Sequence, residues 1–361
     1  MESELKVSEI PGNTPIKKIP KDYYPEGSGF WFRLSEGLDS KKKMFFRNSI
    51  FGNGKPKSTI VFVHGNPENS YTYRKVIKNI IHYAKQPFRI VAMDHIGFGL
   101  SDQATYEMVC MDHANNLFQM IRFLDLRNVT LIVHDWGGPI GIGAFLRDPK
   151  RVSNLVILNS TVFPMPQMGM TYQTYPGSWL NWALGPKIIP DFLWGSFAAF
   201  SIFCKPMGQI KLFVKMIFSI IAKSLGIYGI NEKIAQKLYK TQFKSRLNTL
   251  SSKRLVLQTP MWGYGNTYLE PQLGKRDTSS FYHFIQDNIS ELWGKNGQNI
   301  NVRAICGQWD PSAKSEVIKQ WIENLPQLKG YVKIYKDVGH FIEEIKPKEI
   351  ASEIINVAGL I

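Results

Sequence analysis

Two aspartates and a histidine follow three strand-like stretches, in an order that suits covalent catalysis. Asp135 follows VTLIVH and precedes two glycines, Asp310 follows NVRAICGQW, and His340 follows YVKIYKDVG. A tight strand-to-helix turn with glycines behind the reactive residue is typical of a nucleophile elbow, and such triads occur in the chain order nucleophile, acid, base. The match is partial, because Val133 stands where G-x-Nu-x-G has its first glycine.

An aspartate at the elbow predicts attack on an alkyl carbon. An ionised carboxylate can attack an sp3 carbon in line and form an alkyl ester on the enzyme. His340 would then take a proton from the water that hydrolyses the ester, and Asp310 would orient the imidazole ring. Each residue alone has an ordinary role as a cap or turn residue. Their joint occurrence at strand ends predicts a catalytic site.

Two further residues supply N–H donors beside this carboxylate. Asn66 lies in HGNP after a strand-like run, and Trp136 follows Asp135 directly. Their backbone N–H groups are placed for an oxyanion hole, and their side-chain N–H groups could hold a departing halide. We expect no metal and no cofactor, because the three cysteines are far apart and no histidine spacing matches a metal site.

A sheet must bring these residues together. Apolar, β-branched runs alternate with helix-length stretches, the strands at 58–65, 89–99, 129–138, 155–160, 301–310 and 331–340 and the helices at 72–85 and 111–125. This alternation predicts an α/β fold with a mostly parallel sheet and helices on both faces. Ligands of such sheets bind at the carboxyl ends of the strands.

The alternation of strands and helices stops after the strand at 155–160 and resumes at 301–310, and this interruption predicts the domain organisation. Residues 1–50 read as a polar N-terminal arm that ends in strands near 30–32 and 44–47. Residues 51–160 and 299–361 are the two parts of the core. The mainly helical stretch 161–298 is an inserted cap, and a cap at the carboxyl edge of the sheet would cover the site.

Composition and charge limit the class of protein. The chain has 361 residues, 44% of them hydrophobic and 20% charged, which excludes disorder, collagen and coiled coil for the whole chain. The net charge is +15, and residues 181–260 supply +10 of it, from 12 basic and two acidic side chains. No nucleic-acid motif accompanies this excess, so we expect no nucleic-acid partner. The N-terminus has no secretory signal, which favours a cytoplasmic protein.

One basic and apolar stretch, 208–228, suits a membrane surface. Lys211, Lys215 and Lys223 fall within an arc of about 120° on a helix, and most of the remaining perimeter is apolar. Three central lysines make spanning costly, whereas an interfacial position suits this pattern. Peripheral membrane contact is one hypothesis; a solvated lysine face, a lid over the site and a dimer contact are the alternatives. The apolar surface favours a hydrophobic, long-alkyl substrate.

Five motifs resemble the haloalkane dehalogenases of the α/β-hydrolase fold: FVHGNPENSYTYR, DHIGFGLSD, VHDWGG, VILNSTVFP and DVGHFIEE. The resemblance covers about 58–165 and 300–345. It implies a hydrolase that cleaves carbon–halogen bonds of alkyl substrates, with Asp135 as nucleophile, His340 as base and Asn66 with Trp136 as the halide pair. Asp310, with Asn159 after the earlier strand, is similar to the third dehalogenase subfamily. That subfamily includes the β-lactone decarboxylases of olefin biosynthesis.

Other activities remain open beside dehalogenation. Decarboxylation of a long-chain β-lactone to an olefin is the first alternative. Epoxide hydrolases share the Asp nucleophile, HGxP and HDWGG, although Asn66 stands where that class usually has an apolar or aromatic residue. A non-catalytic binding protein of the same fold is the alternative of a different class, and the intact triad argues against it. Loss of turnover in Asp135→Asn would separate the enzymes from the binding protein.

Overall fold

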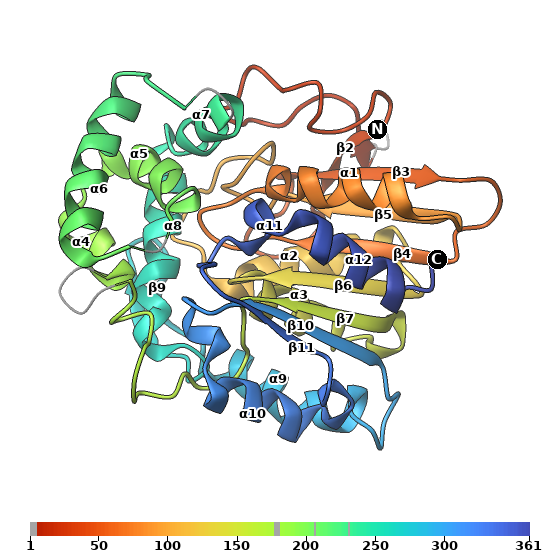
Figure 1. The fold of residues 1–361 in the computed structure, drawn as a ribbon. Coiled ribbons are helices and arrows are strands. Elements are labelled where there is room, and N and C mark those ends of the chain that lie inside the picture. The colour runs from red at the N-terminus through yellow and green to blue at the C-terminus, as the bar shows by residue number, and fades with distance from the viewer. Residues whose placement is uncertain (1–5, 177–180, 206, 230–231) are drawn as a thin grey trace.

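A large twisted sheet forms the centre of the molecule (Figure 1). The computed structural model describes residues 6–176, 181–205, 207–229 and 232–361. Within these residues the sheet has nine strands in the order β1-β2-β3-β5-β4-β6-β7-β10-β11. Their bounds are β1 Val7–Ser8, β2 Gly29–Arg33, β3 Lys43–Phe51, β4 Ser58–Val63, β5 Phe88–Met93, β6 Val129–His134, β7 Val152–Leu158, β10 Asn301–Gly307 and β11 Val332–Tyr335.

The last six strands in this order, β5, β4, β6, β7, β10 and β11, run parallel, which confirms the predicted α/β fold. Every residue of β4 and β6 is buried, as expected for parallel strands covered on both faces. Side chains alternate between the faces along β4: Ile60 and Phe62 pack on one side, and Val61 and Val63 on the other.

Helices cover both faces of the sheet, as predicted. One face carries α1 (Arg74–Tyr83) and α12 (Pro347–Val357), which pack against each other. The other face carries α2 (Cys110–Phe123), α3 (Gly137–Phe145), α9 (Ser279–Trp293) and α10 (Ser315–Asn324). The short α11 (Ile342–Ile345) follows His340 and leads into α12.

The strands expected near 30–32 and 44–47 are confirmed as β2 and β3. They pair antiparallel, and β3 continues antiparallel onto β5, so both strands belong to the central sheet. The preceding chain is tied to the loop after β5, where the Thr14 hydroxyl donates to the Gly99 carbonyl at 2.7 Å. The first five residues of the predicted arm lie outside the described residues.

The chain between β7 and β10 is mainly helical, as expected for 161–298. Figure 1 shows α4 to α8 gathered beyond one end of the sheet, whereas α9 returns to pack on α3. The elements of this segment before α9 are α4 Gly185–Ile188, α5 Asp191–Ile202, α6 Gln209–Ser224, α7 Lys233–Gln242, α8 Arg246–Gln258, β8 Thr267–Glu270 and β9 Gly274–Asp277.

Candidate active site

Asp135 sits in a tight turn between β6 and α3. Its φ of +50° lies in the left-handed region, which non-glycine residues seldom adopt and which is concentrated at functional sites. The glycines behind it are required by space: a Cβ on Gly137 would stand 2.2 Å from the Val63 carbonyl oxygen, and one on Gly138 would stand 2.0 Å from the Ser160 hydroxyl. The turn therefore has the geometry of the nucleophile elbow that the sequence predicts.

The structure brings Asp135, His340 and Asp310 together, although they follow three different strands. His340 Nε2 lies 3.2 Å from Asp135 Oδ1, and His340 Nδ1 lies 2.5 Å from Asp310 Oδ2. The other Asp310 oxygen accepts from the Ser312 backbone N–H at 2.8 Å and from the Ser312 hydroxyl. All three catalytic candidates are buried, and the imidazole ring is held between two carboxylates.

Asn66 approaches Asp135 from the loop after β4. Its backbone N–H donates to Asp135 Oδ2 at 2.8 Å, on the oxygen that does not face His340. The close approach needs Gly65, because a Cβ there would stand 2.4 Å from Asp135 Oδ2. One carboxylate oxygen is thus held by an N–H group, as an ester carbonyl oxygen would be during hydrolysis.

The side chains of Asn66 and Trp136 are fixed by residues that no sequence motif marks. Ser252 of α8 donates its hydroxyl to Asn66 Oδ1 at 2.5 Å and accepts from Trp194 Nε1 at 2.9 Å. The Trp136 ring stacks on Trp262, with the ring centroids 3.9 Å apart. These contacts arise from tertiary packing of the segment between β7 and β10.

A small cavity of about 50 Å³ opens beside the Asp135 carboxylate. Asn66, Trp136 and His340 line it from the core. Its remaining walls are largely aromatic and come from the segment between β7 and β10, with Tyr172, Trp182, Trp194, Phe197 and Trp262. An apolar, enclosed site strengthens every electrostatic interaction inside it.

The charges around His340 set its protonation state. Burial lowers the pKa of His340, but the carboxylates of Asp310 and Asp135 outweigh burial and raise that pKa well above its ordinary value. The ring is therefore an imidazolium while Asp135 is ionised. Esterification of Asp135 would remove one of the two carboxylates and lower the pKa of His340 again, which would release a base when a base is needed.

Asn159 supports the histidine loop. Its side-chain amide donates to the carbonyl oxygens of Gly339 and His340, at 2.9 and 2.5 Å, and its oxygen accepts from the Gly307 N–H at 2.8 Å. The residue thus connects the end of β7 to the loops after β10 and β11. Asn159 therefore helps to position His340 through the backbone of the histidine loop.

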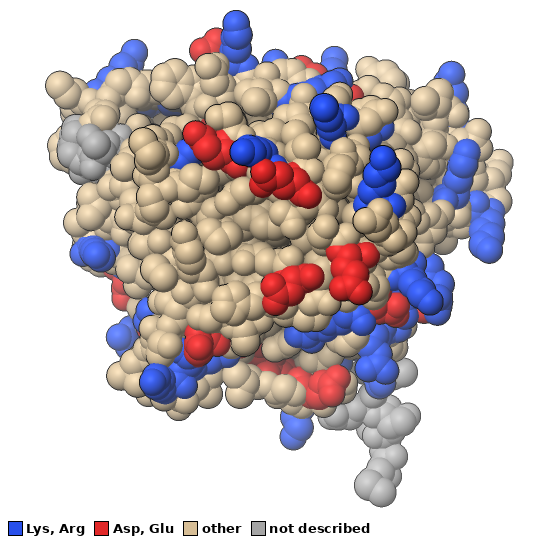
Figure 2. Space-filling model, turned by 90° about the horizontal axis from the view of Figure 1, so that it is seen from below, with Lys and Arg blue, Asp and Glu red and all other residues tan. Residues whose placement is uncertain are grey.

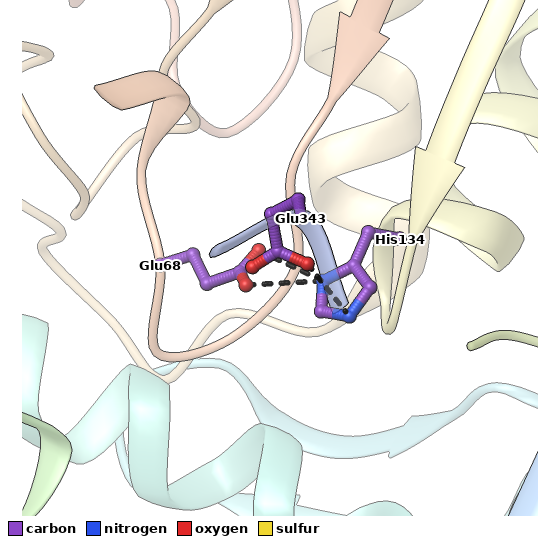
Figure 3. A group of neighbouring side chains, drawn as sticks. All are labelled: Glu68, His134 and Glu343. Atoms are coloured by element: carbon purple, nitrogen blue, oxygen red, sulfur yellow. Dashed lines mark hydrogen bonds and ion pairs between the residues drawn. The ribbon is translucent and has the colours of Figure 1, made fainter. Parts of the chain in front are cut away.

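A second buried cluster lies beneath the site and consists of Glu68, His134 and Glu343 (Figure 3). His134 Nδ1 lies 3.0 Å from Glu68 Oε2, and His134 Nε2 lies 2.8 Å from the His340 carbonyl oxygen. Burial lowers the pKa of His134, but Glu343 and Glu68 outweigh it and raise that pKa to about 9. Burial raises the pKa of Glu343 well above its usual range, and the neighbouring Glu68 carboxylate raises that pKa further.

The cluster has metal-ligand residue types but lacks a free nitrogen ligand. Its candidate ligand atoms lie within 4.8 Å of one another. The His340 carbonyl oxygen can only accept, so Nε2 carries a proton, and a charged ring carries one on Nδ1 as well. Both ring nitrogens of His134 therefore have partners within the protein, and we describe the cluster as a buried hydrogen-bonded group. Glu343 lies within the DVGHFIEE motif, but the sequence alone assigned it no role.

Comparison with known proteins identifies the fold. A family model described as the alpha/beta hydrolase fold matches residues 58–198, which include Asn66, Asp135 and Trp136. The protein is an enzyme of the α/β-hydrolase fold. The crystal structure of the haloalkane dehalogenase DpaA from Paraglaciecola agarilytica has a similar fold, with a TM-score of 0.59 at 17% identity. The match covers 95% of this chain and 97% of the DpaA chain.

The chain is related by sequence to two kinds of enzyme. A cis-3-alkyl-4-alkyloxetan-2-one decarboxylase of Shewanella oneidensis is 27% identical over 307 residues, which is 84% of this chain and 81% of that protein. A haloalkane dehalogenase of Agrobacterium fabrum is 36% identical over 101 residues, which is 28% of this chain and 31% of that protein. The resemblance to haloalkane dehalogenases, and to the β-lactone decarboxylases among them, is confirmed.

Proposed function

We propose that Asp135 attacks an alkyl carbon of a hydrophobic substrate and forms a covalent ester, and that the substrate is a β-lactone with alkyl chains. The observation that carries the chemistry is the carboxylate at the elbow, with one oxygen on the Asn66 N–H and the other beside His340. The relative that matches most of both chains is a decarboxylase of dialkyl β-lactones by name. This relation supports the β-lactone as the first candidate, whereas the motifs alone favour the haloalkane.

The β-lactone reaction needs neither water nor a metal. The Asp135 carboxylate attacks the ring carbon that bears the ring oxygen, and the breaking C–O bond leaves its electrons on a new carboxylate. The bond from this carboxylate to the neighbouring carbon then breaks, CO2 departs, and the electron pair forms the C=C bond while Asp135 leaves with the ester electrons. Atoms balance as lactone to olefin plus CO2. In this reaction the new carboxylate would replace the charge that Asp135 loses, so His340 would stay an imidazolium and would not act as a base.

Haloalkane hydrolysis is the second candidate, because Asn66 and Trp136 flank Asp135 in the cavity. The halide would leave toward their N–H groups, and water would then attack the ester carbonyl with His340 as base. Epoxide opening would need two tyrosine donors. Among the described residues Tyr172 is the single tyrosine that lines the cavity with Asp135, so we do not propose this reaction.

Residues 161–298 serve this chemistry as a cap in our proposal. They supply the aromatic walls that keep the reacting carboxylates away from water, since Trp182, Trp194 and Trp262 line the cavity. Loss of CO2 spreads charge in the transition state, so an apolar enclosure favours it over solvent. Aromatic walls of this kind favour a hydrophobic substrate. Long alkyl chains would need more room than the cavity of about 50 Å³ beside Asp135.

Product analysis separates the two candidates. The purified enzyme is incubated with a cis-3,4-dialkyl β-lactone and, separately, with a 1-bromoalkane of matched chain length. We expect an olefin by gas chromatography from the lactone and slower or no bromide release. Bromide release without olefin would replace the first candidate by the second. Failure of both substrates with folded protein would contradict the proposed chemistry at an alkyl carbon.

A further inference from the structure

Helix α6 exposes a large apolar face. Six of its side chains, which we call the outer face, point away from the protein with 39% to 77% of their surface exposed: Ile210, Val214, Ile217, Phe218, Ile221 and Leu225. The opposite stripe, Leu212, Met216 and Ile220, is buried. Contiguous apolar surface of this kind is rare on soluble monomers and marks an interaction site.

Basic residues flank the outer face. Lys211 and Lys215 are exposed, and at 100° per residue both fall beside the apolar stripe rather than within it. The surrounding stretch 181–260 carries 12 basic and two acidic residues. Figure 2 shows the molecule from below, with basic side chains mostly toward the rim, several acidic side chains nearer the centre and broad uncharged surface between them. An apolar face beside lysines is complementary to a surface with acyl chains under anionic headgroups.

The buried side of α6 faces a chain of cavities that reaches the active site. Trp182 lines the cavity beside Asp135 and also two neighbouring cavities. One of these reaches Leu212 and Met216 of α6, and the other extends from Leu212 to His340. Helix α6 therefore separates an exposed apolar surface from two small interior cavities, of about 10 and 20 Å³, one of which reaches His340.

We propose that the outer face of α6 docks on an anionic lipid bilayer, and that hydrophobic substrate passes from the bilayer beside α6 to Asp135. The docking is inferred from the exposed apolar and basic residues of α6 alone. The delivery of substrate to Asp135 also rests on the proposed function. The contact is peripheral. The 16 residues of α6 extend about 24 Å, short of the roughly 30 Å of a hydrocarbon core. None of the helices within the described ranges is long and apolar enough to span a membrane.

Vesicle flotation tests the docking. The full chain is mixed with vesicles of phosphatidylcholine alone or with 30% phosphatidylglycerol, at low and high salt. We expect flotation with the anionic vesicles at low salt and less at high salt. Replacing Lys211 and Lys215 by Gln should weaken binding about fivefold per lysine. Lys55→Gln with Lys85→Gln is the matched control, because both lysines are exposed outside the 181–260 stretch.

The apolar contact has its own variants. Phe218→Asp with Ile221→Asp should abolish flotation, whereas Ile10→Asp with Leu38→Asp, of similar exposure, should leave it unchanged. Wild-type protein that stays unbound at low salt, or controls that lose as much as the α6 variants, would overturn the proposal. A dimer that dissociates in Phe218→Asp, without vesicle binding by the wild type, would assign the face to a second copy instead.

A soluble short-chain substrate distinguishes the docking from the reaction. The α6 variants should turn over such a substrate at the wild-type rate, while turnover of a vesicle-borne long-chain substrate falls with flotation. Unchanged turnover of the vesicle-borne substrate would overturn the delivery step. If the wild type bound vesicles but converted neither substrate, the docking would stand and the proposed function would fail.

Discussion

The core and the segment between β7 and β10 meet at one cavity but contribute different kinds of surface. The core contributes buried polar groups with fixed partners, from Asp135 and His340 to the Glu68–His134–Glu343 cluster. The segment contributes aromatic walls toward the cavity and an apolar, basic surface outside. In the proposed mechanism the core determines the type of reaction, and the segment determines which substrate reaches it.

The largest effect should come from the core nucleophile. Asp135→Asn keeps the size of the side chain but removes its charge, and we expect the rate to fall by about 10⁴-fold or more. Olefin or halide release measures the loss. The exposed Asp287 is the control, and Asp287→Asn should retain full activity. Substantial turnover by Asp135→Asn would mean that the core does not supply the nucleophile.

A smaller effect should come from a donor at the boundary of the two regions. Trp136 belongs to the elbow but is held in place by Trp262 of the inserted segment. Trp136→Phe removes the indole N–H that we propose binds the developing anion, and it should slow the reaction on the order of 10²-fold. Halide quenching of tryptophan fluorescence is an independent readout. If Trp136→Phe kept the full rate and the full quenching, the anion-binding role would be wrong.

The core residues could be predicted because their signals are local. Asp135, His340 and Asn66 stand at fixed short distances from apolar strand runs and glycines, and a parallel sheet brings strand ends together whatever lies between them. Ser252 and Trp262 carry no such signal, since they reach the site by packing of irregular helices. The lysine arc of α6 was readable, but which side of the helix faces solvent depends on its packing partners.

The core should also respond to pH in a way that the segment does not. Burial lowers the pKa of His113 from 6.5 to about 3, so its neutral form is favoured in the fold. The unfolded chain binds the proton first, and stability falls as pH drops below about 6.5. Between pH 7.5 and 5 we expect His113 alone to cost about 2 kcal/mol, by urea unfolding.

His113→Phe is the variant that isolates this contribution. Its stability relative to wild type should improve toward pH 5, because the proton that only the unfolded wild type binds is gone. A difference between the two proteins that stays constant with pH would show that the buried ring does not titrate on unfolding.

The smallest effect on stability should come from the outer face of α6. Phe218→Asp and Ile221→Asp should each change the free energy of unfolding by less than about 0.5 kcal/mol, as exposed substitutions do. Met216→Ala on the buried side of the same helix should cost about 2 kcal/mol or more. Equal losses on both sides of α6 would show that its outer face packs against part of this chain.

The covalent ester is the central claim, and the mass of the trapped enzyme tests it directly. His340→Phe is incubated for many hours with a 1-bromoalkane, which presents an sp3 carbon to Asp135 but cannot lose CO2, and is then quenched in acid and digested. The account predicts that the peptide containing Asp135 gains the mass of the substrate minus hydrogen bromide, because the base that resolves the ester is absent. An unmodified peptide, or an alkyl group on another residue, would contradict it.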